Sequence, residues 1–218
     1  MGTLVKLQFL VLRNNNLIGQ LPLTLKNCST LALLDVSKNL LSGPIPSRIG
    51  ESMQQLKILS FRVNHFFGSV PLHLCYLSQI QVLDLSKNNL SGQDHEFWNP
   101  ENLLKSIDLS SNSLTDLSRN NFSGNIPSTL PNIDSLGVLD LSNNNLSGRI
   151  PWGRHFETFE ASCFEGNINL CGEQLNKSCP GDETIQETEQ PAIEGEEENS
   201  NFYGALYMSL GLSFFAGF

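Results

Sequence analysis

The sequence predicts an α/β-type solenoid, a curved stack of coils that carries short parallel strands on its concave face. Three observations support this prediction. A frame of regularly spaced leucines recurs through residues 1–151, and its starts at Leu4, Cys28, Met53 and Leu77 lie 24, 25 and 24 residues apart. An asparagine follows the central leucines of each copy, and most copies end on a glycine and a proline. A period of this length is typical of repeat architectures.

Each copy of the frame reads LxxLxxLxLxxNxLxGxxP, and the central Leu-x-Leu is its predicted strand. Alternate residues of a strand point to opposite faces, so the leucines point into the coil and their neighbours form the concave surface. One coil alone cannot bury its leucines, and the stack is therefore the stable unit. This pattern is that of a leucine-rich repeat.

The asparagine of the frame has a predicted structural role. Its amide can donate to and accept from backbone groups of the neighbouring coil, which satisfies polar atoms that the stack buries. The glycine permits a tight bend or positive φ, and the proline fixes the next turn. The predicted series is Asn15, Asn39, Asn64, Asn88, Asn112 and Asn144.

Two stretches depart from the frame, residues 93–100 and residues 113–120. The first replaces the Gly-x-Ile-Pro ending and contains Phe97 and Trp98, so we expect a loop on the convex side. Around the second, Glu101 and Ile133 lie 32 residues apart, which is one repeat plus eight residues. Either eight residues are inserted or sixteen are missing from two full repeats, and a near-duplication within this stretch favours the loss. We expect local disorder or a bulge there.

Three further segments follow the repeats. A C-terminal cap is predicted at residues 152–181, where it would cover the apolar end of the stack. Residues 182–201 form an acidic linker, with no Lys or Arg between Asp182 and Glu198. Residues 202–218 are apolar and uncharged, and as a helix they cover about 25 Å, short of the roughly 30 Å hydrocarbon core. We therefore expect a truncated transmembrane helix.

One face of that helix would carry small residues at i+4 spacing, which allow another helix to pack closely. Small residues are also common in membrane helices that have no such partner. The residues are Ala205, Ser209, Ser213 and Gly217.

The five cysteines are not equivalent. Cys171 and Cys179 lie in a short segment that is too small to bury its own core, and a disulfide between them would staple it. Cys163 is close enough in sequence to leave the pairing open. Cys28 and Cys75 lie two repeats apart, about 10 Å. This distance is too great for a disulfide, so buried thiols are expected.

Glycosylation sequons suit an extracellular protein with a secretory history. Some of them arise from the repeat frame itself, which contains Asn-Asn-Leu-Ser. The five sequons begin at Asn27, Asn89, Asn121, Asn145 and Asn176.

The charge distribution argues against nucleic acid as a partner. The net charge is −9, and no basic stripe is present that could neutralise phosphates. Recognition is instead expected on the concave face, in the first and third repeats, whose outward residues differ from those of the other repeats. The expected ligand or partner residues are Val11, Arg13, Ser60, Arg62 and His65.

Catalysis is not expected from this sequence. Asp84 and Asp108 would stand about 5 Å apart on adjacent strands, the spacing of a retaining glycosidase pair. An open repeating row, however, gives neither carboxyl the distinct buried setting that such a pair requires. The local cluster Asp94-His95-Glu96 lacks metal-ligand spacing. We predict no catalytic residue, no metal site and no cofactor.

The sequence resembles plant leucine-rich-repeat receptor-like proteins. The ending Leu-Ser-Gly-x-Ile-Pro occurs at residues 41–46 and 146–151. The run from Phe159 to Asn167, followed by Leu-Cys-Gly at 170–172 and Cys-Pro-Gly-Asp at 179–182, is similar to the C-terminal cap of that family, which includes the fungal-xylanase and wilt-resistance receptors. By this resemblance the sequence corresponds to the C-terminal ectodomain, the juxtamembrane linker and part of the membrane helix.

The resemblance implies a single-pass type I protein of the plasma membrane with extracellular repeats. Such proteins recognise an extracellular peptide, protein or glycan and signal with partner receptor kinases, in immunity or development. Two alternatives stay open: a secreted leucine-rich-repeat binding or inhibitor protein, and a truncated receptor fragment without function. The segment 202–218 distinguishes the first alternative, because a secreted inhibitor has no use for it.

Overall fold

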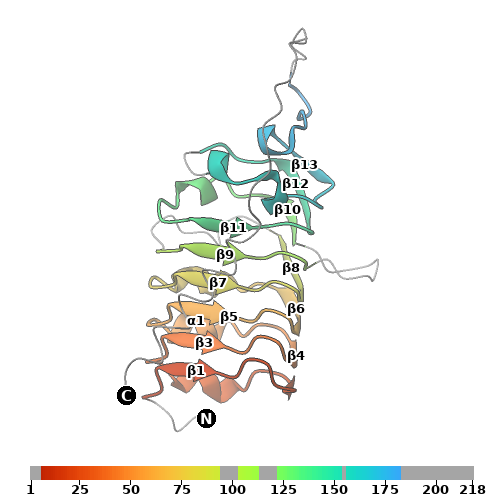
Figure 1. Ribbon diagram of the computed structural model, residues 1–218. Coiled ribbons are helices and arrows are strands. Elements are labelled where there is room, and N and C mark those ends of the chain that lie inside the picture. The colour runs from red at the N-terminus through yellow and green to blue at the C-terminus, as the bar shows by residue number, and fades with distance from the viewer. Residues whose placement is uncertain (1–5, 94–102, 113–121, 154–155, 183–218) are drawn as a thin grey trace, which may run out of the picture. The chain divides into compact units, whose positions relative to one another are not determined.

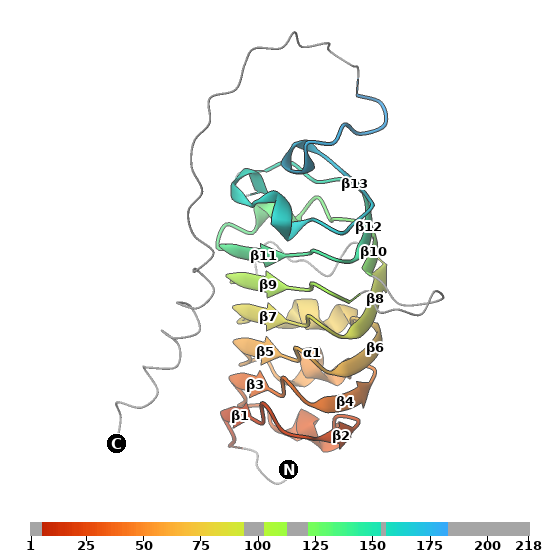
Figure 2. The ribbon, with the colours of Figure 1, turned by 45° about the vertical axis from the view of Figure 1, so that its right-hand side comes forward.

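The repeats form a stack of coils in which each coil adds one strand to each of two sheets (Figures 1 and 2). The computed structural model describes residues 6–93, 103–112, 122–153 and 156–182. These residues belong to one compact unit, Met1–Asp182. The expected linker and membrane helix, beyond Asp182, lie outside the described residues. Among the described residues, no helix has the length and apolar character needed to cross a bilayer.

The first sheet confirms the predicted parallel strands. Its six strands are β1 (Phe9–Val11), β3 (Leu33–Asp35), β5 (Ile58–Ser60), β7 (Val82–Asp84), β9 (Ser106–Asp108) and β11 (Val138–Asp140), and neighbours in this order are paired. The central inward residue of each strand is in register with the next, so these residues form one apolar spine. The spine consists of Leu10, Leu34, Leu59, Leu83, Ile107 and Leu139.

A second parallel sheet lies beside the first, and the sequence analysis did not predict it. Its strands, in sheet order, are β13 (Asn169–Cys171), β12 (Asn145–Arg149), β10 (Phe122–Asn125), β8 (Asn89–Gln93), β6 (His65–Ser69), β4 (Leu40–Gly43) and β2 (Ile18–Gly19). The strands β4, β6, β8 and β12 follow a repeat asparagine, and each buries one apolar side chain, which is Leu41, Phe66, Leu90 or Leu146. The segment Asn-x-Leu-x-Gly therefore forms a strand rather than an irregular turn.

In the described part of the chain, short helices lie on the convex side of the coils. They are the 3-10 helices η1 (Leu23–Asn27), η2 (Leu72–Tyr76) and η3 (Leu130–Asn132) and one α-helical turn, α1 (Arg48–Ser52). Gly50 of α1 is buried against the backbone of η2, and Nε2 of His73 in η2 lies 3.3 Å from Oε1 of Glu51 in α1.

The irregular fifth repeat is one long coil. β9 pairs directly with β11, although the paired residues Ser106 and Val138 lie far apart in the sequence. β10 pairs with both β8 and β12, so one strand continues the second sheet at this level. Structurally, the stretch therefore behaves as one repeat with extra residues, rather than as two shortened repeats. Residues 93–100, apart from Gln93, and residues 113–120 lie outside the described part.

The cap continues the pattern of the repeats before it ends the stack. The N–H groups of Leu141 and Asn143 donate to the carbonyls of Cys163 and Glu165, as if a further coil followed β11. The rings of Phe156 and Phe164 are fully buried with centroids 5.9 Å apart. The 3-10 helices of this region are η4 (Phe156–Thr158), η5 (Ala161–Cys163) and η6 (Glu173–Leu175).

Candidate functional site

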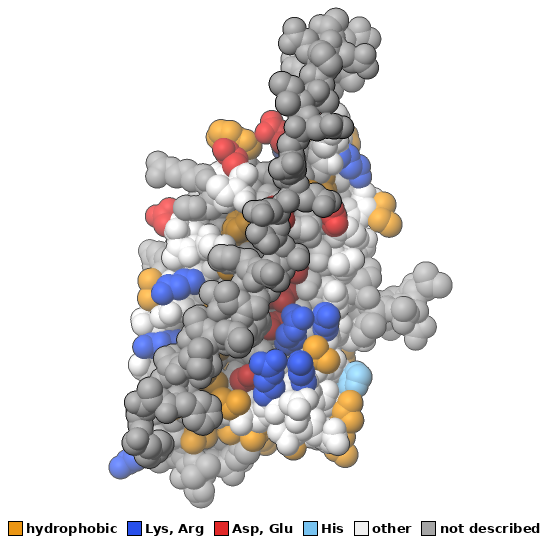
Figure 3. Space-filling view, viewed as in Figure 1, with side chains coloured by type: hydrophobic (Ala, Val, Ile, Leu, Met, Phe, Trp, Pro, Cys, Tyr) orange, Lys and Arg blue, Asp and Glu red, His pale blue; other side chains and the backbone are white. Residues whose placement is uncertain are grey.

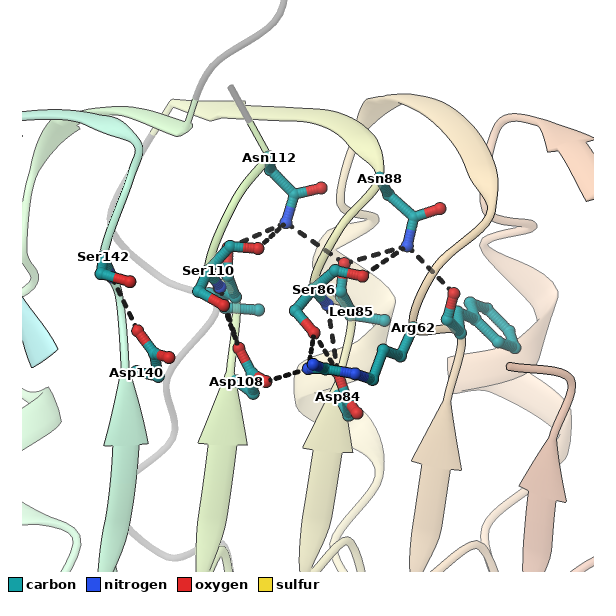
Figure 4. A network of polar contacts seen from close by, with 12 residues as sticks. Arg62, Asp84, Leu85, Ser86, Asn88, Asp108, Ser110, Asn112, Asp140 and Ser142 are labelled. Atoms are coloured by element: carbon teal, nitrogen blue, oxygen red, sulfur yellow. Dashed lines mark hydrogen bonds and ion pairs between the residues drawn. The ribbon is translucent and has the colours of Figure 1, made fainter. Parts of the chain in front are cut away.

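A ladder of buried asparagines fixes the ends of the first-sheet strands from β3 onward, and Figure 4 shows two of them, Asn88 and Asn112. The predicted Asn15, after β1, is instead exposed and donates to carbonyls of its own coil. The Nδ2 group of Asn88 donates to the carbonyl oxygens of Phe61, Leu85 and Ser86 at 3.0–3.1 Å, and its Oδ1 accepts the N–H of Phe66 at 3.1 Å. Each amide therefore bonds both its own coil and the preceding one, as the sequence predicts. The equivalent contacts of Nδ2 recur at Asn39, Asn64, Asn112, Asn144 and, in the cap, Asn167.

Three rows of outward side chains run across the strands of the concave face. The apolar row is Phe9, Leu33, Ile58, Val82 and Val138, and its equivalent position in β9 holds the polar Ser106. The next row is aspartate in four of the six strands, and we call it the acid row. It is Val11, Asp35, Ser60, Asp84, Asp108 and Asp140. Two residues further along each coil, the hydroxyl row is Arg13, Ser37, Arg62, Ser86, Ser110 and Ser142.

Each aspartate of the acid row binds the serine that follows it. Oδ1 accepts the serine N–H at 2.8 Å from Ser37, 3.2 Å from Ser86, 3.0 Å from Ser110 and 3.0 Å from Ser142. The hydroxyls of Ser86 and Ser110 also donate to the same oxygens at 2.6 and 2.7 Å. The Asp-x-Ser pattern is therefore a local device that satisfies backbone N–H groups where the strands end.

Arg62 connects two of these motifs. Its Nη1 donates to Ser86 Oγ at 2.7 Å and to Asp108 Oδ2 at 2.8 Å, so one guanidinium bridges β7 and β9 (Figure 4). The side chain is 29% exposed, and that of Asp108 is 21% exposed. Arg62, which the sequence predicts to contact a ligand, is thus bound to its own scaffold.

Asp84 occupies a more buried position than the sequence analysis expected. It is 6% exposed, and burial, followed by the charge of Asp108, raises its pKa to about 6. The expectation of an open row is therefore wrong for this carboxyl. Its Oδ1 is nevertheless held by Ser86, and Asp108 is held by Ser110 and Arg62, which assigns both carboxylates to the scaffold. The described residues contain no group of three His, Cys, Asp or Glu side chains that could hold a metal.

The raised pKa of Asp84 predicts that this residue contributes less to stability near pH 7 than near pH 4. The folded carboxyl binds its proton at about pH 6, whereas an unfolded aspartate does so near pH 3.9. Between these values the folded state holds more protons, so the free energy of unfolding falls as pH rises, by at most about 3 kcal/mol. Burial raises the pKa of Asp140 in the same direction, and hydrogen bonds from Cys179 and Arg149 lower that of Asp182, which acts oppositely.

Urea denaturation of Asp84→Asn at several pH values tests this prediction. The amide keeps an acceptor for Ser86 but cannot ionise. We expect the variant to lose most of the pH dependence between about pH 4 and 7 and to exceed the wild type in stability at neutral pH. An unchanged slope would assign the pH dependence to another group.

The remaining predicted residues are spread over both sheets. Val11 is 58% exposed at the end of β1, and Ser60 lies two strands away in the same row, with Asp35 between them. Arg13 is exposed, and His65 is also exposed but begins β6 in the second sheet. The concave face therefore brings together four of the five predicted residues and leaves His65 beside it.

The structure joins Cys171 to Cys179 by a disulfide with Cα atoms 5.1 Å apart, and Cys163 forms no disulfide with a described residue. Of the sequon asparagines, Asn27, Asn145 and Asn176 are exposed and Asn89 is half-buried. Asn89 and Asn145 begin strands of the second sheet, away from the concave rows. Asn121 and the four small residues Ala205, Ser209, Ser213 and Gly217 lie outside the described residues.

A further row, which sequence reasoning missed, lies beyond the hydroxyl row. We call it the rim: the residue before each ladder asparagine, in left-handed backbone conformation. Its members are Asn14, Lys38, Val63, Lys87, Ser111 and Asn143, with φ from 54° to 59°. The alignment of the repeats would have placed these residues together, but nothing in their variable types marked them as a row.

Comparisons with known proteins agree with this architecture. A model of the leucine-rich-repeat family matches residues 6–28, 79–100, 116–133 and 135–153. A search of curated proteins found no match. Among solved structures, the ectodomain of the Arabidopsis thaliana receptor kinase GASSHO1/SCHENGEN3, bound to CASPARIAN STRIP INTEGRITY FACTOR 2, is 34% identical with a TM-score of 0.62. The match covers 81% of this chain and 23% of that ectodomain.

Two other Arabidopsis structures are similar. The receptor kinase HAESA, solved with the peptide hormone IDA and the co-receptor SERK1, is 34% identical with a TM-score of 0.59, over 82% of this chain and 32% of that one. The BIR2 ectodomain is 30% identical with a TM-score of 0.50, over 78% of this chain and 71% of that one. The chain thus spans only about a quarter to a third of the two larger ectodomains.

The chain belongs to the leucine-rich-repeat family, in the form found in the ectodomains of plant receptors.

Proposed function

We propose that this chain is a non-catalytic, receptor-like protein of the cell surface, whose concave face recognises an extracellular peptide and which assembles with a partner receptor kinase. The observation that carries the proposal is the first sheet. Its inward residues and ladder asparagines repeat almost without change, while the outward residues of β1 and β5 differ from those of the other coils. An invariant scaffold with a varied outer row is the arrangement expected of a recognition surface.

The similar receptors support the ligand and partner classes. HAESA was solved with both a peptide hormone and the co-receptor SERK1, and GASSHO1/SCHENGEN3 with CASPARIAN STRIP INTEGRITY FACTOR 2. We extend these roles to this chain, including a role in immune or developmental signalling. The resemblance to the fungal-xylanase and wilt-resistance receptors favours the receptor-like type, which lacks a kinase of its own.

The SERK1 ectodomain is a suitable partner probe. The full chain, produced in a plant secretory host, is titrated with it by biolayer interferometry. We expect Val11→Glu with Ser60→Glu, on the concave face, to weaken binding about tenfold or more, because buried charge without a partner is costly at an interface. Leu23→Glu with Leu72→Glu is the matched control, since both residues are exposed at the start of η1 and η2. Equal losses in both pairs would contradict recognition by the concave face.

Membrane attachment is a separate part of the proposal. We propose that residues 202–218 form the beginning of a membrane helix, which makes the protein type I with extracellular repeats and glycans on some of its sequons. Alkaline carbonate extraction of membranes that carry the expressed full chain tests this point. Retention in the membrane pellet is expected, whereas release into the supernatant would favour the secreted binding protein instead.

A further inference from the structure

The rim presents a row of side chains along the edge of the concave face. Each rim residue donates its N–H to the next coil: Lys38 to Arg62, Val63 to Ser86 and Lys87 to Ser110, at 2.8–3.0 Å. Successive rim positions are therefore one strand spacing apart, about 4.8 Å. Lys38 and Lys87, which flank Val63, are about 10 Å apart along the rim.

The rim is cationic over its first four coils. Lys38, Lys87 and the neighbouring Arg13 are exposed, and among the described residues none of them forms an ion pair with a carboxylate. Figure 3 shows a cluster of Lys and Arg side chains beyond the ends of the first-sheet strands in this half of the stack. In the later coils the rim carries Ser111 and Asn143, so the positive surface is local in a chain of net charge −9.

Val63 is the rim residue that the fold itself does not explain. Its φ is 55°, a conformation that β-branched residues rarely adopt, and it is 37% exposed. The other coils place asparagine, lysine or serine at this position. Val63 is not part of the buried core, so its partly exposed apolar surface is the feature that distinguishes this coil.

Building on the proposed function, we propose that Lys38, Val63 and Lys87 bind an acidic peptide segment, with carboxylates on the two lysines and an apolar side chain on the valine. In a polyproline II peptide, residues three apart lie on the same side and about 9 Å apart. This spacing matches that of the two lysines. The recognised pattern is thus acid-x-x-acid, in which an intervening apolar residue points about 120° away from the acids and packs on the flank of Val63. Arg13 extends the site by one further charge.

The apolar surface favours a peptide over an acidic polysaccharide. Both classes carry carboxylates, but a chain of uronic acids presents hydroxyl groups to the exposed apolar surface of Val63. Burial of such surface requires apolar side chains on the ligand.

Fluorescence anisotropy of the full chain with labelled probe peptides tests the proposal. The probe is an extended peptide of about eight residues with two Glu residues three apart and Leu between them. Its counterpart has Gln in place of Glu, and trigalacturonic acid serves as the sugar acid. We expect the Glu peptide to bind at least about fivefold more tightly than the Gln peptide, with a difference that shrinks as salt is raised.

Charge-matched lysine variants locate the site. Lys38→Gln with Lys87→Gln is expected to weaken binding of the Glu peptide about fivefold or more. Lys57→Gln with Lys105→Gln removes the same charge from two exposed lysines that precede β5 and β9, at the opposite ends of the strands. This control should stay within about twofold of the wild type, because the screened charges are distant from the peptide.

Val63→Asn separates strain from recognition. Asparagine tolerates the left-handed conformation, so the thermal midpoint should rise by about 3 °C, while binding of the Glu peptide should weaken about threefold. Equal losses in the two lysine pairs, a Gln peptide that binds as well as the Glu peptide, or binding of trigalacturonic acid alone would overturn the proposal. None of these outcomes changes the result expected in the SERK1 titration of the concave variants. The proposed function and the peptide site on the rim are therefore tested separately.

Discussion

Replacing Asn88 by alanine is expected to lower the free energy of unfolding by about 3–5 kcal/mol. Asn88 is fully buried, and its loss leaves the N–H of Phe66 and the carbonyls of Phe61, Leu85 and Ser86 without their amide partner. A buried polar group left unsatisfied costs about 1–3 kcal/mol, and the partners lie in two successive coils. Urea denaturation of the full chain, followed by circular dichroism, measures the change.

Asn144→Ala is the matched control in the same ladder. Its Nδ2 makes the equivalent bonds to the carbonyls of Leu109, Leu141 and Ser142, but its buried Oδ1 has no partner among the described residues. Removing this side chain orphans no N–H group and also removes an uncompensated acceptor. We expect a loss smaller than that of Asn88→Ala by about 1–2 kcal/mol. Equal losses would show that the acceptor bond contributes little to the ladder.

Gly50→Ala is expected to destabilise the protein by about 3 kcal/mol or more. A Cβ atom at this position would lie 1.8 Å from the carbonyl oxygen of His73 and 2.7 Å from the nitrogen of Leu74. Both contacts are with backbone, so the clash is relieved only if α1 and η2 move apart and open the core between them. Thermal and urea denaturation would both report the loss.

Gly68→Ala is the control for the general effect of glycine replacement. Gly68 has a φ of +79°, and a Cβ atom added there would have no neighbouring atom within 4 Å. Alanine therefore meets only local backbone strain of about 1–2 kcal/mol. Gly50→Ala should cost distinctly more. A smaller effect at Gly50 would mean that the convex helices shift apart without disturbing the core.

The repeat frame predicted the first sheet because every inward leucine is constrained by its counterparts in neighbouring coils. Leu34, Leu59 and Leu83 are aligned and buried as the spacing requires. The ladder was also predictable, since a buried amide at a fixed position must find backbone partners. Such features depend on distances along one coil, which the sequence displays directly.

Features that depend on contacts between variable residues were not predictable. Arg62 contacts Ser86 and Asp108, one and two coils away, and no local pattern encodes these contacts. Asp84 was expected in an open row, but it is only 6% exposed. The close approach of Gly50 to η2 likewise depends on how two convex turns pack, which the spacing of leucines does not fix.

β9 pairs directly with β11, and β10 pairs with both β8 and β12. The position of the strands in the stack is therefore independent of the length of chain between them. Strand pairing sets where a coil must begin and return, but it does not limit how much chain lies between those points, since loop closure costs rise only slowly with length. An array of this kind can therefore gain residues within one coil while the spacing of its outer rows stays the same. Loop length and the spacing of the outward-facing positions are thus free to evolve independently.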